Sequence, residues 1–288
     1  MARSRRRRRR PFRRLLCLLC IISLSLFFLQ RSNCLLQVDT YTFSSPRLPA
    51  GFEGYTIVQL SDLHGAVFGE DNEDLYHAIR SAAPDLIVLT GDLQDRFRET
   101  PRSYVITLCT ALQEIAPTAY VAGNHEWALP DIRGLKRDIA ATGVTVLTNT
   151  FIPLERDGDT ILLAGVDDPN GFSDQKTPEE VAAAVNAAAS DPFWILLAHR
   201  NNLFAPQYSL LGADLVISGH AHGGLFRLPF TDGLIGVERN LFPSYTAGFY
   251  EENNSTLLVS RGLGNSGRSF RLFNRPEVVV LTLSRDGS

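Results

Sequence analysis

Five of the six histidines, together with two aspartates and an asparagine, lie in short loops that follow apolar stretches of the chain. These loops read SDLHG (61–65), TGDLQD (90–95), AGNHE (122–126), AHR (198–200) and SGHAHGG (218–224). Imidazole, carboxylate and amide ligands together favour Mn²⁺, Fe²⁺ or Zn²⁺ over Ca²⁺. In D-x-H and H-x-H, alternate side chains point the same way, so both can reach one site. The pattern therefore predicts a metal site.

The elements that must position these loops are strands. Apolar stretches directly before the loops predict strands at 55–60, 85–90, 118–122, 193–199 and 213–220. Helices are predicted at 73–83, 102–115, 131–143 and 177–190, and further strands at 144–147, 160–166, 255–260 and 277–284. This alternation favours an α/β sandwich, in which ligands bind beyond the carboxyl ends of the strands. A single Asp or His at a strand end is usually a turn residue. Five such ends in one chain predict a shared site.

At these loops the sequence resembles the calcineurin-like metallophosphoesterase superfamily, whose blocks are D-x-H, G-D, G-N-H-[DE], H and G-H-x-H. All five blocks are present in order between Asp62 and His222. The sequence after His222 resembles the branch of membrane-associated bacterial phosphodiesterases, so the resemblance covers nearly everything after residue 50. It implies a four-layer αββα sandwich with a dinuclear metal site at the carboxyl ends of the strands.

The resemblance also implies a role for each polar residue of the blocks. The ligands of the first metal would be Asp62, His64 and His222. The ligands of the second would be Asn124, His199 and His220. The carboxylate of Asp92 would bridge the two. Such a pair of cations lowers the pKa of a shared water to give hydroxide and clamps the phosphoryl oxygens for in-line attack. We expect Mn²⁺, with Fe²⁺ or Zn²⁺ as alternatives.

Three further residues are implicated in handling the substrate. His125 would bind no metal, but would donate a hydrogen bond to the phosphate or protonate the leaving oxygen. The sequence GDLQDR resembles the G-D-x-x-D-R sequence of the protein-phosphatase branch, so Asp95 would orient His125 and Arg96 would bind phosphate. A solvated turn is the alternative interpretation of this pair. Asn124 is assigned to substrate binding as well as to the metal.

The first 31 residues differ from the rest of the chain, because they contain ten of the 28 basic residues and no acidic one. The apolar stretch 15–29 would form a helix of about 23 Å, short of the roughly 30 Å hydrocarbon core. That length fits a signal-peptide core or a short anchor. No A-x-A cleavage site follows, so we expect an uncleaved, single-pass anchor with the arginines in the cytoplasm and the domain outside it. Residues 9–12 either resemble a twin-arginine export signal or match it by chance.

We therefore divide the chain into an arginine-rich N-terminus with a signal anchor or transmembrane segment (1–31), a linker (32–51) and a metallophosphoesterase domain (52–288). From residue 32 onward, 18 basic residues accompany 31 acidic ones, a formal net charge of −13. An acidic body binds nucleic acid poorly, so no nucleic-acid partner is expected. The expected partners are a phosphorylated small molecule or lipid as substrate, and the membrane.

These features predict a membrane-anchored phosphoesterase that uses a metal-bridged hydroxide to hydrolyse a phosphodiester or pyrophosphate bond. The apolar and aromatic stretch 225–250 is either ordinary core or a wall that contacts acyl chains. The second interpretation favours a lipid-linked substrate, such as a UDP-2,3-diacylglucosamine-type lipid. A small-molecule phosphodiesterase or a nuclease is an alternative. A non-catalytic scaffold of the same fold is another, although such a protein would have lost ligands and none is missing here.

Overall fold

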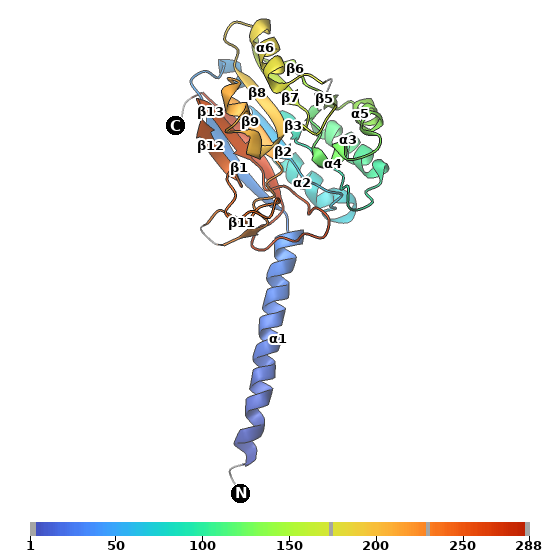
Figure 1. The fold of residues 1–288 in the computed structure, drawn as a ribbon, viewed down its shortest axis with the longest axis vertical. Helices are drawn as coiled ribbons and strands as arrows, with labels where there is room; N and C mark the ends of the chain where they lie inside the picture. Colours follow the sequence, from blue (N-terminus) through green and yellow to red (C-terminus); the bar gives the residue numbers. More distant parts are fainter. Residues whose placement is uncertain (1–3, 173–174, 229–230, 286–288) are drawn as a thin grey trace.

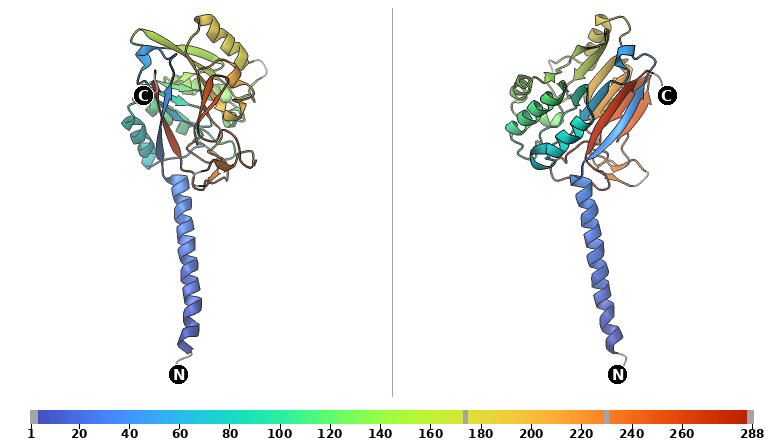
Figure 2. Two further views of the ribbon diagram at one scale, coloured as in Figure 1. Left: turned by 90° about the vertical axis from the view of Figure 1, so that its left-hand side faces the viewer. Right: turned by 180° about the vertical axis from the view of Figure 1, so that it is seen from behind.

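Two six-stranded sheets pack face to face in the computed structural model, which describes residues 4–172, 175–228 and 231–285, with side chains from Phe12 onward (Figures 1 and 2). The strand order of the first sheet is β1 (Gln37–Ser44), β14 (Glu277–Ser284), β2 (Thr56–Leu60), β3 (Leu86–Leu89), β4 (Thr118–Tyr120) and β5 (Thr145–Val146). The order of the second is β12 (Gly248–Glu252), β13 (Ser255–Val259), β9 (Leu215–Gly219), β8 (Trp194–Arg200), β7 (Asp159–Val166) and β6 (Thr150–Arg156).

The central strands are apolar on both faces. In β2, Ile57 packs in the layer between the two sheets, while Val58 packs against the helices. In β8, Ile195 and Leu196 divide in the same way between the inner and the outer layer. Strands β2, β3 and β4 are parallel, as are β7, β8 and β9. Parallel strands that are buried on both faces have continuous apolar sequences. These strands could therefore be predicted from the sequence.

Helices cover the outer face of each sheet. The first sheet is covered by α2 (Glu73–Ser81), α3 (Arg102–Ile115) and α5 (Ile132–Ala141), and the second by α6 (Pro178–Ala188). A capping box starts α6: Thr177 Oγ1 accepts a hydrogen bond from the N–H of Glu180, and the Glu180 carboxylate accepts one from the N–H of Thr177. The resulting four layers are the predicted αββα sandwich.

The segment 32–51, expected to be a linker, contains strand β1. This strand pairs in parallel with β14 along all eight of its residues, so the first sheet begins at Gln37 rather than after residue 51. The sequence QVDTYTFS is largely polar, and in it only Phe43 is fully buried. An edge strand of this kind is stabilised mainly by backbone pairing with its neighbour. It therefore lacks the apolar signal that marks the central strands.

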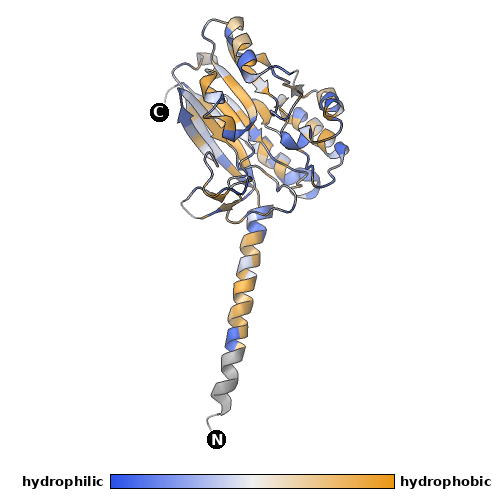
Figure 3. Cartoon of the chain, in the orientation of Figure 1, coloured by the Kyte–Doolittle hydropathy of each residue, from blue (hydrophilic) through white to orange (hydrophobic). Residues whose placement is uncertain are grey.

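Helix α1 (Ser4–Cys34) leaves one end of the domain and extends away from it (Figures 1 and 3). The segment Phe12–Cys34 is 23 residues long and contains an 18-residue window with a mean hydropathy of 2.1. It is long and apolar enough to cross a membrane, although a signal sequence would meet the same criterion. The helix continues beyond the predicted apolar stretch 15–29. Its last turn is held by the loop before β14, where the N–H of Arg271 donates to Asn33 Oδ1 and that of Phe273 donates to Ser32 Oγ.

Candidate active site

The carboxyl ends of β2, β3, β4, β8 and β9 meet at one edge of the sheets, and the loops that follow them bring seven side chains together. They are the predicted metal ligands Asp62, His64, Asp92, Asn124, His199, His220 and His222. All are buried except His220, which is partly exposed. Asn124 begins the one-turn helix α4 (Asn124–Trp127) directly after β4. The sixth histidine, His77, is exposed on α2 and lies outside this group.

Asp62, His64 and His222 form the first cluster. The Nε2 atoms of His64 and His222 are 3.1 Å apart, and Asp62 Oδ1 lies 3.3 Å from His222 Nε2. The Asp62 carboxylate also accepts hydrogen bonds from Ser61 Oγ at 2.6 Å and from the N–H of His220 at 3.0 Å. These contacts fix the direction in which the carboxylate faces the two imidazoles.

His199 is at the centre of the second cluster. Its Nε2 lies 3.1 Å from Asn124 Oδ1, 3.2 Å from His220 Nδ1 and 3.2 Å from Asp92 Oδ2. Its Nδ1 lies 2.8 Å from the carbonyl oxygen of Thr90, which holds the proton on Nδ1 and leaves Nε2 to face the cluster. The same Asp92 Oδ2 is 3.8 Å from His64 Nε2. Asp92 thus lies between the two clusters, where a bridging ligand would have to be.

The donor set fits divalent cations. Burial lowers the pKa of His64 and of His220 to about 3, so both imidazoles are neutral and present lone pairs to their neighbours. Burial would also lower the pKa of His199, but the Asp92 carboxylate raises it to about 10. The His199 ring is therefore protonated and balances the charge of the Asp92 carboxylate, a role that a bound cation would otherwise fill. Facing nitrogen lone pairs beside a buried carboxylate and an amide oxygen are the ligands that Mn²⁺, Fe²⁺ and Zn²⁺ accept.

The backbone of the site is strained. Five of the seven side chains belong to residues in the left-handed region, with φ between 47° and 67°: Asp62, His64, Asp92, His220 and His222. Residues other than glycine seldom adopt this conformation, and where they do they cluster at functional sites. Cross-strand hydrogen bonds hold it here, because the N–H of Asp62 donates to the carbonyl of Gly91 and that of His64 donates to the carbonyl of Asp92.

Two glycines allow the loops to approach one another. A Cβ at Gly219 would lie 1.8 Å from Ser61 Oγ and 2.4 Å from Asp62 Oδ2. A Cβ at Gly123 would lie 2.2 Å from Asp92 Oδ1. Any side chain at either position would displace a member of the clusters. This explains why glycine precedes the ligand residue in both the third and the fifth loop.

His125 lies beside the clusters with its two ring nitrogens in different surroundings. Nδ1 is 3.3 Å from Asp95 Oδ1, and Nε2 is 3.9 Å from Asp92 Oδ2. Burial lowers the pKa of His125, and the Asp92 and Asp95 carboxylates act in the opposite direction. A phosphate beside Nε2 would further favour the protonated ring. The guanidinium of Arg96 lines the adjacent cleft and stacks on Phe97, with its central carbon 4.5 Å from the ring centroid.

Asp95 has more partners than the sequence suggested. It accepts hydrogen bonds from the N–H groups of Phe97 at 2.8 Å and Gly267 at 2.6 Å, and from Arg98 Nε at 3.0 Å. It therefore ties the loop after β3 to the loop before β14, in addition to facing His125. His125 Nδ1 itself accepts a hydrogen bond from the N–H of Arg96 at 3.1 Å, so the orientation of this ring is shared between Asp95 and the backbone of Arg96.

The sequence did not single out four other residues that support the site. Glu126 is buried and accepts hydrogen bonds from the N–H groups of Asp92, Gln94 and Gly123, and burial raises its pKa to about 7. Ser266 Oγ lies 3.3 Å from His125 Nε2, and buried Arg271 places Nη2 3.3 Å from His222 Nδ1. Asn33, from α1, holds the backbone of Arg271. Only Glu126 had a sequence signal, as the last residue of G-N-H-[DE].

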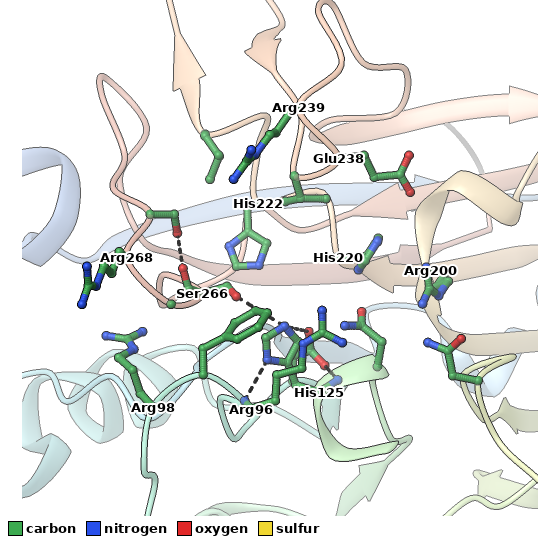
Figure 4. Close-up of a pocket in the computed structure, with 18 residues that line it drawn as sticks. Arg96, Arg98, His125, Arg200, His220, His222, Glu238, Arg239, Ser266 and Arg268 are labelled. Carbon is green, nitrogen blue, oxygen red and sulfur yellow. Dashed lines mark hydrogen bonds and ion pairs between the residues drawn. The ribbon is translucent and has the colours of Figure 1, made fainter. Parts of the chain in front are cut away.

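A cleft of about 1100 Å³ opens beside the two clusters (Figure 4). Five arginines line it: Arg96, Arg98, Arg200, Arg239 and Arg268. Arg200 is paired with Asp168 and Arg98 with Asp95. The other three make no ion pair among the described residues and are free to meet an anionic substrate. The cleft is thus cationic although the body of the chain is acidic.

The family model of calcineurin-like phosphoesterases matches residues 55–224, the part of the chain that contains both clusters. The chain belongs to this family. It is therefore a metal-dependent phosphoester hydrolase, and the resemblance in the sequence is confirmed, as is the fold.

Three relatives illustrate the similarity. The chain is 31% identical over 262 residues to the uncharacterized metallophosphoesterase YkuE of Bacillus subtilis, covering 86% of each chain. It is 29% identical over 228 residues to YkoQ of the same organism, covering 77% of this chain and 81% of that one. It is 27% identical over 306 residues to the UDP-2,3-diacylglucosamine pyrophosphatase LpxG of Chlamydia trachomatis, covering 86% of this chain and 89% of that one.

Proposed function

We propose that this chain is a membrane-anchored phosphoesterase that hydrolyses a phosphodiester or pyrophosphate bond in a lipid-linked substrate. The observation that carries the proposal is the position of the cleft. It lies beside the two clusters, it is lined by arginines (Figure 4), and its lining loop 266–269 is joined to the end of α1 through Asn265, whose Nδ2 donates to Asn33 Oδ1. The LpxG relative is named for its action on UDP-2,3-diacylglucosamine, which supports a substrate of this kind.

The roles of the site residues follow from their positions. Asp62, His64 and His222 would hold one divalent cation, Asn124, His199 and His220 the other, and Asp92 both; Mn²⁺ is the cation we propose. When bound, the cations would supply positive charge to the phosphoryl oxygens and lower the pKa of water. Arg96 and the Asn124 amide would bind the phosphate. Water attacks phosphorus and releases a proton to solvent, the bond from phosphorus to the leaving oxygen breaks, and His125 Nε2 gives that oxygen its proton while Asp95 orients the ring.

The orientation in the membrane follows from charge. The arginines at the start of α1 would stay in the cytoplasm, which would place the cleft on the extracytoplasmic side, close to the bilayer surface. A substrate there would be held in the membrane by acyl chains. A soluble phosphodiester is the second candidate, because the cleft is open enough to admit one and the arginines recognise phosphate alone.

The experiment is a comparison of matched substrates with the full-length protein in detergent micelles and Mn²⁺. UDP-2,3-diacylglucosamine, a UDP-sugar without acyl chains, a phospholipid diester, bis-p-nitrophenyl phosphate and the monoester p-nitrophenyl phosphate would be compared by kcat/KM. We expect an acylated substrate to exceed its acyl-free counterpart. Equal values for both would favour a soluble phosphodiester, and hydrolysis of monoesters alone would contradict the proposed bond type.

A further inference from the structure

Large apolar side chains remain exposed on the loops around the cleft. Six of them are Phe97, Leu228, Leu241, Phe242, Phe270 and Phe273, which we call the apolar rim. Leu241 and Phe242 are adjacent and are 69% and 75% exposed. Soluble surfaces rarely gather such residues in one place, and a contiguous apolar patch usually marks a surface of interaction.

The loops of the apolar rim form one connected structure. Short strands β10 (Phe226–Arg227) and β11 (Gly233–Ile235) pair with each other, and β10 also bridges to Leu272. The N–H of Phe242 donates to the carbonyl of Leu234, which attaches the exposed pair to β11. Figures 1 and 2 place β11 and its neighbouring loops at the end of the domain where α1 emerges.

Helix α1 determines where the apolar rim would lie relative to a bilayer. The ring of Phe28 packs against that of Phe273 with centroids 5.3 Å apart, and Phe28 lies at the end of the apolar stretch of α1. A helix of the length of Phe12–Cys34 spans about 34 Å, slightly more than the roughly 30 Å hydrocarbon core. If α1 crosses a bilayer, Phe28 and Phe273 therefore lie where the hydrocarbon meets the headgroups. The apolar rim lies at that level.

The charges next to the apolar rim indicate what it contacts. Arg239 and Arg268 lie on the same loops, and their side chains make no ion pair or hydrogen bond among the described residues. Exposed apolar side chains interspersed with unpaired cations fit the surface of an anionic bilayer, where the apolar groups enter the headgroup boundary and the cations meet phosphate. A protein partner would have to supply acidic residues opposite both arginines, whereas the phosphates of an anionic bilayer pair with them at any position.

We propose that the apolar rim docks onto the surface of the same bilayer that α1 crosses, with Leu241 and Phe242 inserted at the headgroup boundary. This proposal rests on the proposed function for the membrane position of α1. Arg239 and Arg268 belong both to the docked surface and to the cleft lining. The mouth of the cleft would then open onto the headgroup plane, and a lipid-linked phosphate would reach the clusters without leaving the membrane.

Lipid contact can be measured without turnover. Full-length protein would be reconstituted in vesicles of phosphatidylcholine and phosphatidylglycerol, with either ordinary or brominated acyl chains, which quench tryptophan on contact. Leu241→Trp tests the apolar rim. Leu210→Trp is the matched control, because Leu210 is 66% exposed and follows Ser209, which bonds Asn253 in the turn between β12 and β13, at the opposite end of the sheet. Wild-type emission would be subtracted, because Trp127 and Trp194 are native.

We expect brominated lipid to quench the added tryptophan of Leu241→Trp and to leave that of Leu210→Trp unchanged. Equal emission of Leu241→Trp in both kinds of vesicle would overturn the proposal, and so would equal quenching of the two variants. A blue shift of Leu241→Trp without quenching would also overturn it, because it would indicate a second copy of the chain as the occupant. Hydrolysis of bis-p-nitrophenyl phosphate by both variants would show that they are folded. Quenching without hydrolysis of any lipid substrate would sustain the docking surface and contradict the proposed function.

Discussion

The middle and the carboxyl ends of the same strands follow different physical rules. Between the sheets, residues such as Ile57, Leu197 and Ile217 are fully buried and their neighbours are apolar. A few residues further along, the chain buries carboxylates and imidazoles on a left-handed backbone. The first region lowers the free energy of the fold, and the second raises it. A rigid apolar interior is what lets the strained ends persist, because they have no alternative packing to relax into.

The largest effect should come from removing the charge between the two clusters. Asp92→Asn keeps the size of the side chain and its contact with the N–H of His125, but removes the carboxylate that faces both His64 and His199. We expect loss of most bound metal and of essentially all hydrolysis, measured by elemental analysis and by rate. Asp138→Asn on exposed α5 is the control and should keep both. Near-normal metal content with full activity would show that Asp92 is not the bridge.

Substitution of His125 should reduce the rate of hydrolysis without reducing the amount of bound metal. In His125→Asn we expect the metal content to stay and turnover to fall by roughly 10²–10⁴-fold, because proton transfer to the leaving oxygen is lost. The loss should be smaller for p-nitrophenyl esters, whose leaving group needs little protonation. Equal losses for good and poor leaving groups would exclude the acid role and leave phosphate binding as the function of the ring.

A pair of variants tests the comparison itself. Leu197→Ala creates a cavity between the sheets and should reduce the free energy of unfolding by about 2–5 kcal/mol, with activity kept well below the melting temperature. Gly219→Ala forces a Cβ into Ser61 and Asp62, and should reduce activity by roughly 10²-fold with a smaller change in stability. Denaturant unfolding and rate measurements on both variants check this. If both variants lose stability and activity to the same extent, the interior and the site do not contribute separately to stability and to activity.

The same contrast explains what the sequence could predict. Central strands such as β3 and β8 were located because burial on both faces leaves a continuous apolar stretch. The residues of the two clusters could be grouped because they follow those stretches in order. Strands β1, β6 and β12 were missed because edge strands are half exposed and carry polar residues. Ser266, Arg271 and Asn33 were missed for another reason. Their partners lie far away along the chain, and nothing in the neighbouring residues records such a contact.

The smallest effect should come from Asn33, which joins α1 to the site. Its Nδ2 donates to the carbonyl of Arg271 at 2.9 Å, and its Oδ1 accepts from the N–H of Arg271 at 2.8 Å and from Asn265 Nδ2 at 2.9 Å. The same loop carries Ser266 beside His125 and the side chain of Arg271 beside His222. Asn33 is therefore a positioning residue, because it holds the loop that contacts His125 and the first cluster without touching the substrate.

Asn33→Ala should lower kcat for bis-p-nitrophenyl phosphate while KM and metal content stay unchanged. A buried hydrogen bond contributes about 1 kcal/mol, so partial loosening of the loop corresponds to a fall of up to roughly fivefold. Asn33→Asp keeps the two accepted bonds and loses the two donated ones, to the carbonyls of Leu29 and Arg271, and should fall between wild type and Asn33→Ala. Gln30→Ala, one turn earlier on the exposed side of α1, is the control and should match wild type. If Asn33→Ala lowers the melting temperature but leaves kcat unchanged, α1 only supports the domain. A selective loss of kcat would mean that the helix end helps to set the geometry of the site.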